Sequence, residues 1–122
     1  MKVVINDCRG QFDLSESAIA QYAKRKGISL FLVRDFETIL HKKYKKNFYY
    51  TKPKEKRIDA NDGLWKVQDI KRNDAILIDL VTELGTKCNS IVSRLKVVEV
   101  EDNKKWKIRA DDGKEFLEEV VA

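Results

Sequence analysis

A polar turn near the N-terminus combines residue types that bind anionic ligands. It occupies residues 6–13, between an apolar run at residues 2–5 and a helix that is expected to start at about Ser15. A turn between the end of a strand and the start of a helix leaves backbone amides unpaired, and these amides favour anions. The candidate ligand-binding residues of the turn are Asn6, Cys8, Arg9, Gly10 and Phe12. We therefore expect the turn to form half of a pocket for a negatively charged nucleotide.

Hydrophobic spacing predicts the elements that hold this turn. Residues 2–5 are rich in β-branched side chains and suit a buried strand. Ser15 can cap the following helix and Gly27 can end it. The apolar stripe of this helix consists of Ala18, Ile19, Tyr22 and Ala23. A second strand at residues 28–33 follows closely, as in a strand–helix–strand unit, so the two strands are expected to be parallel.

The middle of the chain is less regular. Apolar residues near helical spacing predict a short helix at residues 34–44, and aromatic residues predict a strand at residues 47–51. Residues 54–69 are expected to form a long polar loop, which Trp65 and Val67 hold against the body of the protein.

The second half of the chain predicts one more helix and then strands. The helix has apolar residues at a period near 3.6, Asn73 or Asp74 can cap it, and Gly85 ends it. Three strands of an antiparallel meander follow, at about residues 95–100, 105–110 and 115–117. We therefore predict an α+β fold in a single domain spanning residues 1–122, with a small mixed sheet, an N-terminal strand–helix–strand unit, a second helix and a C-terminal antiparallel meander.

Composition and charge limit the classes of function. The 122 residues are 43% hydrophobic and carry a net charge of +5, concentrated at residues 41–46 and 52–57. Such an excess attracts nucleic acids, nucleotides or phosphates, although a basic run can equally be a solvated face. No apolar run approaches the ~20 residues needed to span a bilayer, and no signal peptide is evident, so we expect an intracellular protein with free thiols at Cys8 and Cys88. One histidine and two separate cysteines do not make a metal site, and we expect neither a metal nor a cofactor.

Two strings of residues resemble a family of small phage proteins. The first consists of residues 2–6, Cys8, Gly10, Phe12, Leu14, Ser15, Ala18, Ile19, Tyr22 and Ala23. The second consists of residues 83–85, Lys87, Asn89, residues 95–100, residues 106–108, Asp112 and Gly113. Over residues 2–119 the chain resembles the first-described Thoeris anti-defence family, whose members sequester an immune signal. The family turn often has the sequence Cys-aromatic-Gly-Gly-Phe, whereas this chain has Arg9 and Gln11 at two of those positions.

The resemblance implies a function and a set of partners. Thoeris systems detect phage infection with a TIR-domain enzyme that makes cyclic ADP-ribose isomers from NAD, and these messengers activate an NAD-consuming effector. Members of the family bind the messenger tightly without cleaving it, and related members also capture cyclic oligonucleotides. They form homodimers with nucleotide pockets near the subunit interface, and larger rings such as hexamers. The resemblance thus implies a non-enzymatic homo-oligomer in the host cytoplasm that captures a cyclic ADP-ribose-type nucleotide and has no membrane partner.

The chemistry of such a ligand assigns roles to individual residues. Arg57 and Arg109 are the candidate guanidinium partners of the pyrophosphate, and Phe12 is the candidate platform for the adenine ring. Further candidates, from the two polar turns and the strand that carries Arg109, are Asn6, Lys87, Asn89 and Asp111.

Each assignment has a structural alternative. Phe12 can pack on the first helix as a hydrophobic staple, Arg109 can lie on a solvated sheet face, and Arg57 can be one more loop charge. Asparagines such as Asn6 and Asn89 are more common as turn residues than as ligands. The resemblance favours the ligand-binding roles.

Two other classes of function compete with this prediction. A phosphodiesterase or NAD glycohydrolase needs a general acid or base beside the scissile bond. His41 lies in a lysine run without an evident orienting carboxylate, so we expect no enzyme. The alternative is a small basic phage protein that binds nucleic acid, which the aromatic residues Tyr44, Phe48, Tyr49 and Tyr50 among the lysines support.

Overall fold

The computed structural model describes residues 1–120, and within them all side chains except those of residues 36–39 and 43–45. Over these residues the chain forms two α-helices, α1 (Glu16–Lys26) and α2 (Ala75–Leu84). The strands are β1 (Lys2–Asn6), β2 (Phe31–Ile39), β3 (Lys42–Tyr50), β4 (Leu64–Trp65), β5 (Leu95–Glu99), β6 (Lys105–Asp111) and β7 (Lys114–Val120). Three short 3-10 helices complete the described chain, η1 (Lys54–Lys56), η2 (Val67–Asp69) and η3 (Gly85–Cys88).

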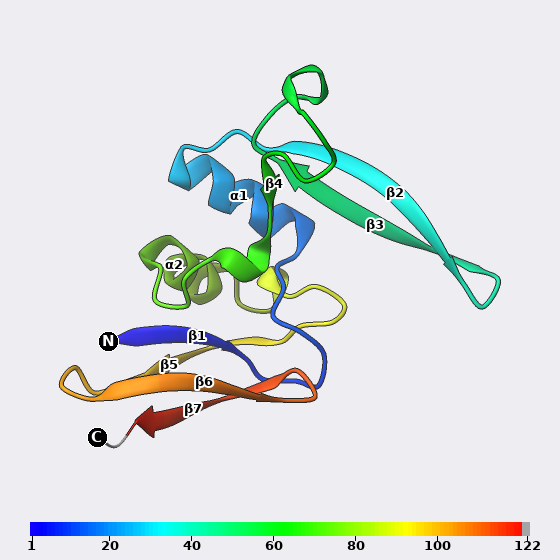
Figure 1. Ribbon diagram of the computed structural model, residues 1–122. Helices are drawn as coiled ribbons and strands as arrows, with labels where there is room; N and C mark the ends of the chain where they lie inside the picture. Colours follow the sequence, from blue (N-terminus) through cyan, green and yellow to red (C-terminus); the bar gives the residue numbers. More distant parts are fainter. Residues whose placement is uncertain (121–122) are drawn as a thin grey trace.

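The strands form three small antiparallel sheets, which confirms the predicted α+β class. β1 pairs with β5, β3 lies between β2 and β4, and β6 pairs with β7. The strands β1, β5, β6 and β7 lie together on one side of the helices, whereas the β2–β3 hairpin begins beside α1 and projects away from the body (Figure 1). The expected parallel pairing of the first two strands is wrong, because β1 pairs antiparallel with β5 and β2 belongs to another sheet. A parallel strand is usually a continuous apolar run, and β2 turns polar at Arg34 and Asp35.

The helix expected at residues 34–44 is also wrong. These residues form the tip of the β2–β3 hairpin, whose register runs from Phe31 opposite Tyr50 to Ile39 opposite Lys42. The turn between the strands contains Leu40 and His41, with φ angles of 52° and 65°. Two central residues with positive φ are typical of a type I′ turn, which matches the twist of the two strands. This pair lacks the glycine or asparagine that would have signalled the hairpin.

Both predicted helix starts are confirmed by their caps. The Ser15 hydroxyl accepts a hydrogen bond from the amide of Ala18 at 3.2 Å, and α1 ends at Gly27 in the left-handed region with φ of 75°. One Asp74 carboxylate oxygen accepts from the amides of Ile76 and Leu77, at 2.9 and 3.1 Å. α2 ends at Gly85, as its spacing predicts.

Asp74 also joins the two helices. Its second oxygen accepts hydrogen bonds from the Tyr22 hydroxyl and the Lys26 ammonium, each at 2.9 Å. The side chains of Leu77 and Leu80 are fully buried nearby, in a core that lies between the helices and the β1–β5 ladder. Burial favours protonation of Asp74, but the hydrogen bonds from Lys26, the Leu77 amide and Tyr22 outweigh it and lower its pKa.

This pKa shift predicts how the stability of the protein depends on pH. A carboxylate whose pKa is lowered by folding stabilises the native state above its unfolded pKa of about 4, and this contribution is lost as the pH falls through the folded value. We expect Asp74→Asn to lower the free energy of unfolding by about 1–3 kcal/mol at pH 7 and by much less at pH 3. Urea unfolding at both pH values measures this, with Asp79→Asn, at an exposed position of the same helix, as the control. An equal loss at both pH values would contradict the role of the Asp74 charge.

Several further expectations about the fold can be compared with the structure. Val67 is buried, and Trp65 lies 6.0 Å from Tyr22 and 6.1 Å from Tyr49 between ring centroids, so these residues do hold the long loop against the body. β6 and β7 form the C-terminal hairpin of the expected meander, whereas β5, the first of its three expected strands, pairs with β1. Cys8 and Cys88 are free thiols, and burial raises the pKa of Cys88 to about 11. Within residues 1–120, no helix combines the length and the apolar character that a membrane crossing requires.

Candidate ligand-binding groove

A groove of about 820 Å³ lies between the start of α1, the strand β3 and the loop after η3. Small-molecule sites in proteins commonly have volumes of about 300–1,000 Å³, so the groove is large enough for a dinucleotide-sized ligand. Its described lining residues are Gln11, Asp13, Leu14, Ser15, Glu16, Ile19, Lys46, Asn47, Phe48, Tyr49, Leu64, Trp65, Lys66, Val67, Gln68, Asn89, Ser90 and Ile91.

The short length of β4 leaves this groove open. β4 pairs with β3 only at Tyr49 and Tyr50, so the rest of β3 has no strand partner on that side. After β4 the chain turns into η2, and residues 66–68 form another part of the groove wall. The N-terminal polar turn contributes Gln11 and Asp13 from the opposite side. Segments that are far apart in the sequence therefore build the groove together.

Aromatic rings and amides dominate one wall. The rings of Tyr49 and Trp65 meet edge to face, with planes at 80°. Two lining amides already have protein partners, because Gln68 donates to the Phe12 carbonyl at 3.1 Å and Asn89 accepts from the Leu95 amide at 2.8 Å.

Two other polar groups of this wall are buried and have no hydrogen-bond partner among the described residues. These are the carbonyl oxygen of Asn47 and the hydroxyl of Tyr49. Burial raises the pKa of Tyr49, and the nearby charge of Glu16 adds to the rise. The Asn47 amide lies close enough to oppose this rise, but no hydrogen bond of acceptable geometry joins it to the hydroxyl.

Charges of both signs surround the groove. Asp13 and Glu16 lie at the start of α1, and Glu16 forms an ion pair with Arg34 of β2. Lys46 of β3 and the exposed Lys66, which follows β4, also line the groove. Carboxylates can accept hydrogen bonds from sugar hydroxyls, and ammonium groups can bind phosphate oxygens. The groove therefore presents polar groups suited to each part of a nucleotide.

Asn6 and Phe12 are the buried residues of the predicted N-terminal turn, among residues 6–13. Asn6 is fully buried and donates to the carbonyls of Cys8 and Gly113, at 3.0 and 2.9 Å. Its carbonyl oxygen accepts from the Arg94 amide at 2.8 Å. Cys8 lies beside it, with Sγ 3.4 Å from Asn6 Oδ1. Asn6 thus fixes the turn and has no capacity left for a ligand, as its structural alternative predicts.

Close backbone contacts explain the glycine of this turn. A Cβ atom on Gly10 would lie 2.0 Å from the Val92 carbonyl oxygen. A Cβ atom on Gly113, whose φ is +82°, would lie 1.6 Å from the Gly10 carbonyl oxygen. The N-terminal turn therefore packs directly on the β6–β7 turn, while the neighbouring Arg9 is exposed.

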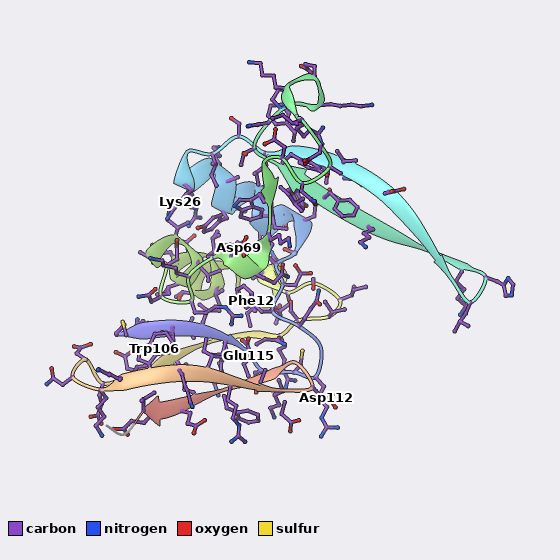
Figure 2. The ribbon with its side chains drawn as sticks, in the orientation of Figure 1. Phe12, Lys26, Asp69, Trp106, Asp112 and Glu115 are labelled. Atoms are coloured by element: carbon purple, nitrogen blue, oxygen red, sulfur yellow. The ribbon has the colours of Figure 1, made fainter. Side chains whose placement is uncertain are left out.

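Phe12 belongs to the core and is not an open stacking platform. It is 4% exposed, and the Arg72 guanidinium lies 3.5 Å from the centre of its ring. Arg72 in turn forms two hydrogen bonds to Glu115 of β7, one of them at 2.9 Å and the other shorter. Figure 2 shows Phe12 and Glu115 where the helices meet the C-terminal strands. Because Arg72 covers this ring, a ligand in the groove cannot stack on it in this conformation.

The other predicted residues lie on separate surfaces. Arg57 stacks on Tyr50, 3.9 Å from the ring centre, in the loop at the top of Figure 1. Arg109 and Asp111 are exposed on β6, in the strand layer at the opposite end of the molecule. Lys87 is exposed in η3, where its carbonyl accepts from the Ser15 hydroxyl at 2.7 Å. Of the ligand-binding residues predicted from the sequence, Asn89 is the one that appears in the described lining of the groove.

Sequence reasoning missed the residues that form most of the groove wall. Asn47 was the available signal for this wall, because it is an amide within an aromatic run. Alternation along a strand places it on the same face as Tyr49. Among the described residues, no group of three or more His, Cys, Asp or Glu is placed to hold a metal ion. Comparison of the chain with protein-family models, with curated proteins and with solved structures finds no match.

Proposed function

We propose that this protein captures a cyclic ADP-ribose-type nucleotide in the groove and holds it without cleaving it. In this proposal it acts as a phage anti-defence protein in the host cytoplasm, where it blocks Thoeris signalling. Two observations support the proposal, the resemblance of two sequence strings to that family and the groove itself. The groove carries the main weight, because it offers about 820 Å³ lined by aromatic rings, amides, carboxylates and ammonium groups.

The available contacts are strong enough for tight capture. A stacked base contributes about 1–3 kcal/mol, and each hydrogen bond to a charged group about 1.5–3 kcal/mol. Several such contacts can approach the ~12 kcal/mol of a nanomolar complex, before the cost of ordering the ligand is subtracted. A cyclic nucleotide is already constrained, so that cost is smaller than for its linear form. A protein that must compete with an effector for its messenger needs this strength.

The geometry of the groove favours storage of the ligand. Its described lining contains neither histidine nor cysteine, and His41 lies exposed at the tip of the β2–β3 hairpin. Glu16, one of the two lining carboxylates, is paired with Arg34. The proposal therefore gives every lining residue a binding role and assigns none of them a proton-transfer step.

Recovery of intact ligand tests this function. The protein is incubated with glycocyclic ADP-ribose, separated from free nucleotide by filtration, and then heat-denatured. We expect chromatography to recover the bound nucleotide unchanged and in stoichiometric amount. Absence of nucleotide from the protein fraction would contradict capture, and recovery of a linear or hydrolysed product would contradict storage.

Binding of nucleic acid is the second candidate, and contacts between cations and aromatic rings of β3 favour it. Lys46 lies 5.4 Å from the ring centre of Phe48, and Arg57 covers Tyr50. Cations beside aromatic rings are typical of single-strand binding surfaces, whose affinity falls steeply with salt. Titration of an oligonucleotide and of glycocyclic ADP-ribose at two salt concentrations separates the two candidates. The messenger is expected to lose less affinity, because the groove partly shields its charges.

The proposal includes self-association. Phe31, Leu32 and Val33 of β2 are 41%, 37% and 37% exposed, and β2 is an edge strand. A long edge strand with exposed apolar residues is a template for pairing with another chain. A second copy on the hairpin would bury these residues and give a homodimer or a larger ring, such as a hexamer.

A further inference from the structure

We infer that Asn47 and Tyr49 recognise the adenine of the captured nucleotide, so that the groove is an adenine-selective nucleoside site. This inference rests on the proposed function and deepens it. It assigns the base to the wall formed by β3 and Trp65, and it predicts which purine the protein accepts.

The two residues share one face of the hairpin. Asn47 lies opposite Arg34 and Tyr49 opposite Leu32 in the β2–β3 register, and Tyr49 also pairs with Trp65 of β4. Side chains two residues apart on a strand point to the same side, here toward the start of α1. Both side chains line the groove, and each has a buried polar atom without a protein hydrogen bond.

Buried polar atoms without partners are unusual. Most such atoms in proteins are hydrogen-bonded, and leaving one unpaired is unfavourable. In the same strand, the Tyr50 hydroxyl donates to the Ala60 carbonyl at 2.9 Å. β3 therefore carries two adjacent tyrosines. The Tyr50 hydroxyl has a protein partner, whereas the buried Tyr49 hydroxyl has none among the described residues. A ligand that forms hydrogen bonds with Asn47 and Tyr49 supplies the partners that these two buried atoms lack.

With the Asn47 carbonyl oxygen turned toward the ligand, the hydrogen-bonding character of the pair favours adenine. The Asn47 carbonyl oxygen only accepts, so its partner must be a donor, whereas the Tyr49 hydroxyl can donate. Adenine presents an amine donor next to a ring-nitrogen acceptor, and guanine presents two acceptors at the equivalent edge. Hypoxanthine also has an oxygen in place of the amine. An adenine edge therefore satisfies both groups, and a 6-oxopurine places one acceptor against another.

The neighbouring residues suit the rest of a nucleotide. Trp65 offers an aromatic surface beside Tyr49, on which a base can stack. Asp13 and Glu16 face the same groove and can accept hydrogen bonds from ribose hydroxyls. Lys66 follows Trp65 directly in the chain, and its ammonium group can bind a phosphate oxygen. The lining thus provides for base, ribose and phosphate within one groove.

The two tyrosines give a matched pair of variants. Tyr49→Phe removes a hydroxyl that has no protein partner, so we expect an unchanged or higher melting temperature and an affinity for glycocyclic ADP-ribose about 5–10-fold weaker. Tyr50→Phe removes a satisfied hydroxyl, so we expect a lower melting temperature and unchanged affinity. Calorimetric titration with ADP-ribose and with inosine diphosphate ribose measures base selectivity. We expect a preference of at least about 10-fold for ADP-ribose that Asn47→Leu abolishes.

The two tryptophans locate the bound nucleotide. Trp65 lines the groove, whereas Trp106 lies in the C-terminal strand layer (Figure 2). We expect the indole N–H resonance of Trp65 to shift on addition of glycocyclic ADP-ribose and that of Trp106 to stay in place. Capture with wild-type affinity by Tyr49→Phe, or a shift of Trp106 without one of Trp65, would overturn the inference and leave the proposed function intact. Failure to bind glycocyclic ADP-ribose would overturn the proposed function. The adenine site would still be supported if ADP-ribose shifted the Trp65 resonance and Tyr49→Phe weakened that binding.

Discussion

Glu115→Ala is expected to destabilise the protein by about 3–5 kcal/mol, which corresponds to a fall of roughly 10–20 °C in the melting temperature. Glu115 is 8% exposed and pairs with Arg72, whose side chain is 17% exposed. Its carboxylate also accepts from the Asn6 amide at 2.8 Å. The substitution leaves the Arg72 guanidinium largely buried beside Phe12 without its counter-charge, and it leaves the Asn6 amide without its acceptor. Removal of one partner of a buried ion pair is far more damaging than replacement of both.

Thermal and urea unfolding measure this effect. Glu118→Ala is the matched control, because Glu118 is an exposed glutamate on the same strand, and we expect it to stay within about 0.5 kcal/mol of the unmodified protein. A combined Arg72→Met and Glu115→Leu variant is expected to recover much of the loss, since no buried charge then lacks a partner. If Glu115→Ala unfolds at the same temperature as Glu118→Ala, this ion pair does not join the N-terminal turn to the C-terminal hairpin in the way described.

Lys66→Glu is expected to weaken capture of glycocyclic ADP-ribose by at least about 100-fold without unfolding the protein. Lys66 is exposed at the groove, so its charge can be reversed at little cost to packing. The change removes a charge-assisted hydrogen bond of about 1.5–3 kcal/mol and places a like charge near the pyrophosphate. Calorimetric titration measures the affinity, and Lys71→Glu, which changes an exposed lysine outside the groove, is the control for net charge.

Alanine variants of Arg57 and Arg109 test the alternative position of the nucleotide. Their assignment from sequence to the pyrophosphate predicts that replacement of either weakens capture strongly. In the structure neither arginine lines the groove of its own chain, so capture within one chain predicts that Arg57→Ala and Arg109→Ala change the affinity only a few-fold. Normal capture by Lys66→Glu together with loss of capture in both arginine variants would place the nucleotide between copies of the chain and outside this groove.

The sequence was most informative where structure depends on neighbouring residues. Ser15, Gly27 and Asp74 were predicted as helix boundaries because a cap is a local hydrogen bond or a local backbone conformation. The β2–β3 hairpin escaped prediction because Leu40 and His41 adopt positive φ without the usual turn residues. The local spacing of apolar residues favoured a helix at residues 34–44. In the structure, the pairing of two nine-residue strands outweighs this local preference.

The groove could not be predicted in the same way, because long-range contacts create it. Phe12 has the residue type of a stacking platform, but contacts with distant segments, among them Arg72, make it part of the core. Asn47 and Tyr49 belong to an aromatic, basic stretch that suggested a nucleic-acid surface. Their position in the groove wall follows from the two-residue length of β4 and from the position of α1.

A structure of the protein crystallised with glycocyclic ADP-ribose tests the central claim most directly. The account predicts intact nucleotide in the groove, with adenine against Trp65, its amine on the Asn47 carbonyl oxygen and a phosphate near Lys66. The arrangement of copies in the same crystals shows whether β2 forms an interface. Nucleotide bound at Arg109 on the C-terminal strands, with the groove of every copy empty, would contradict the account.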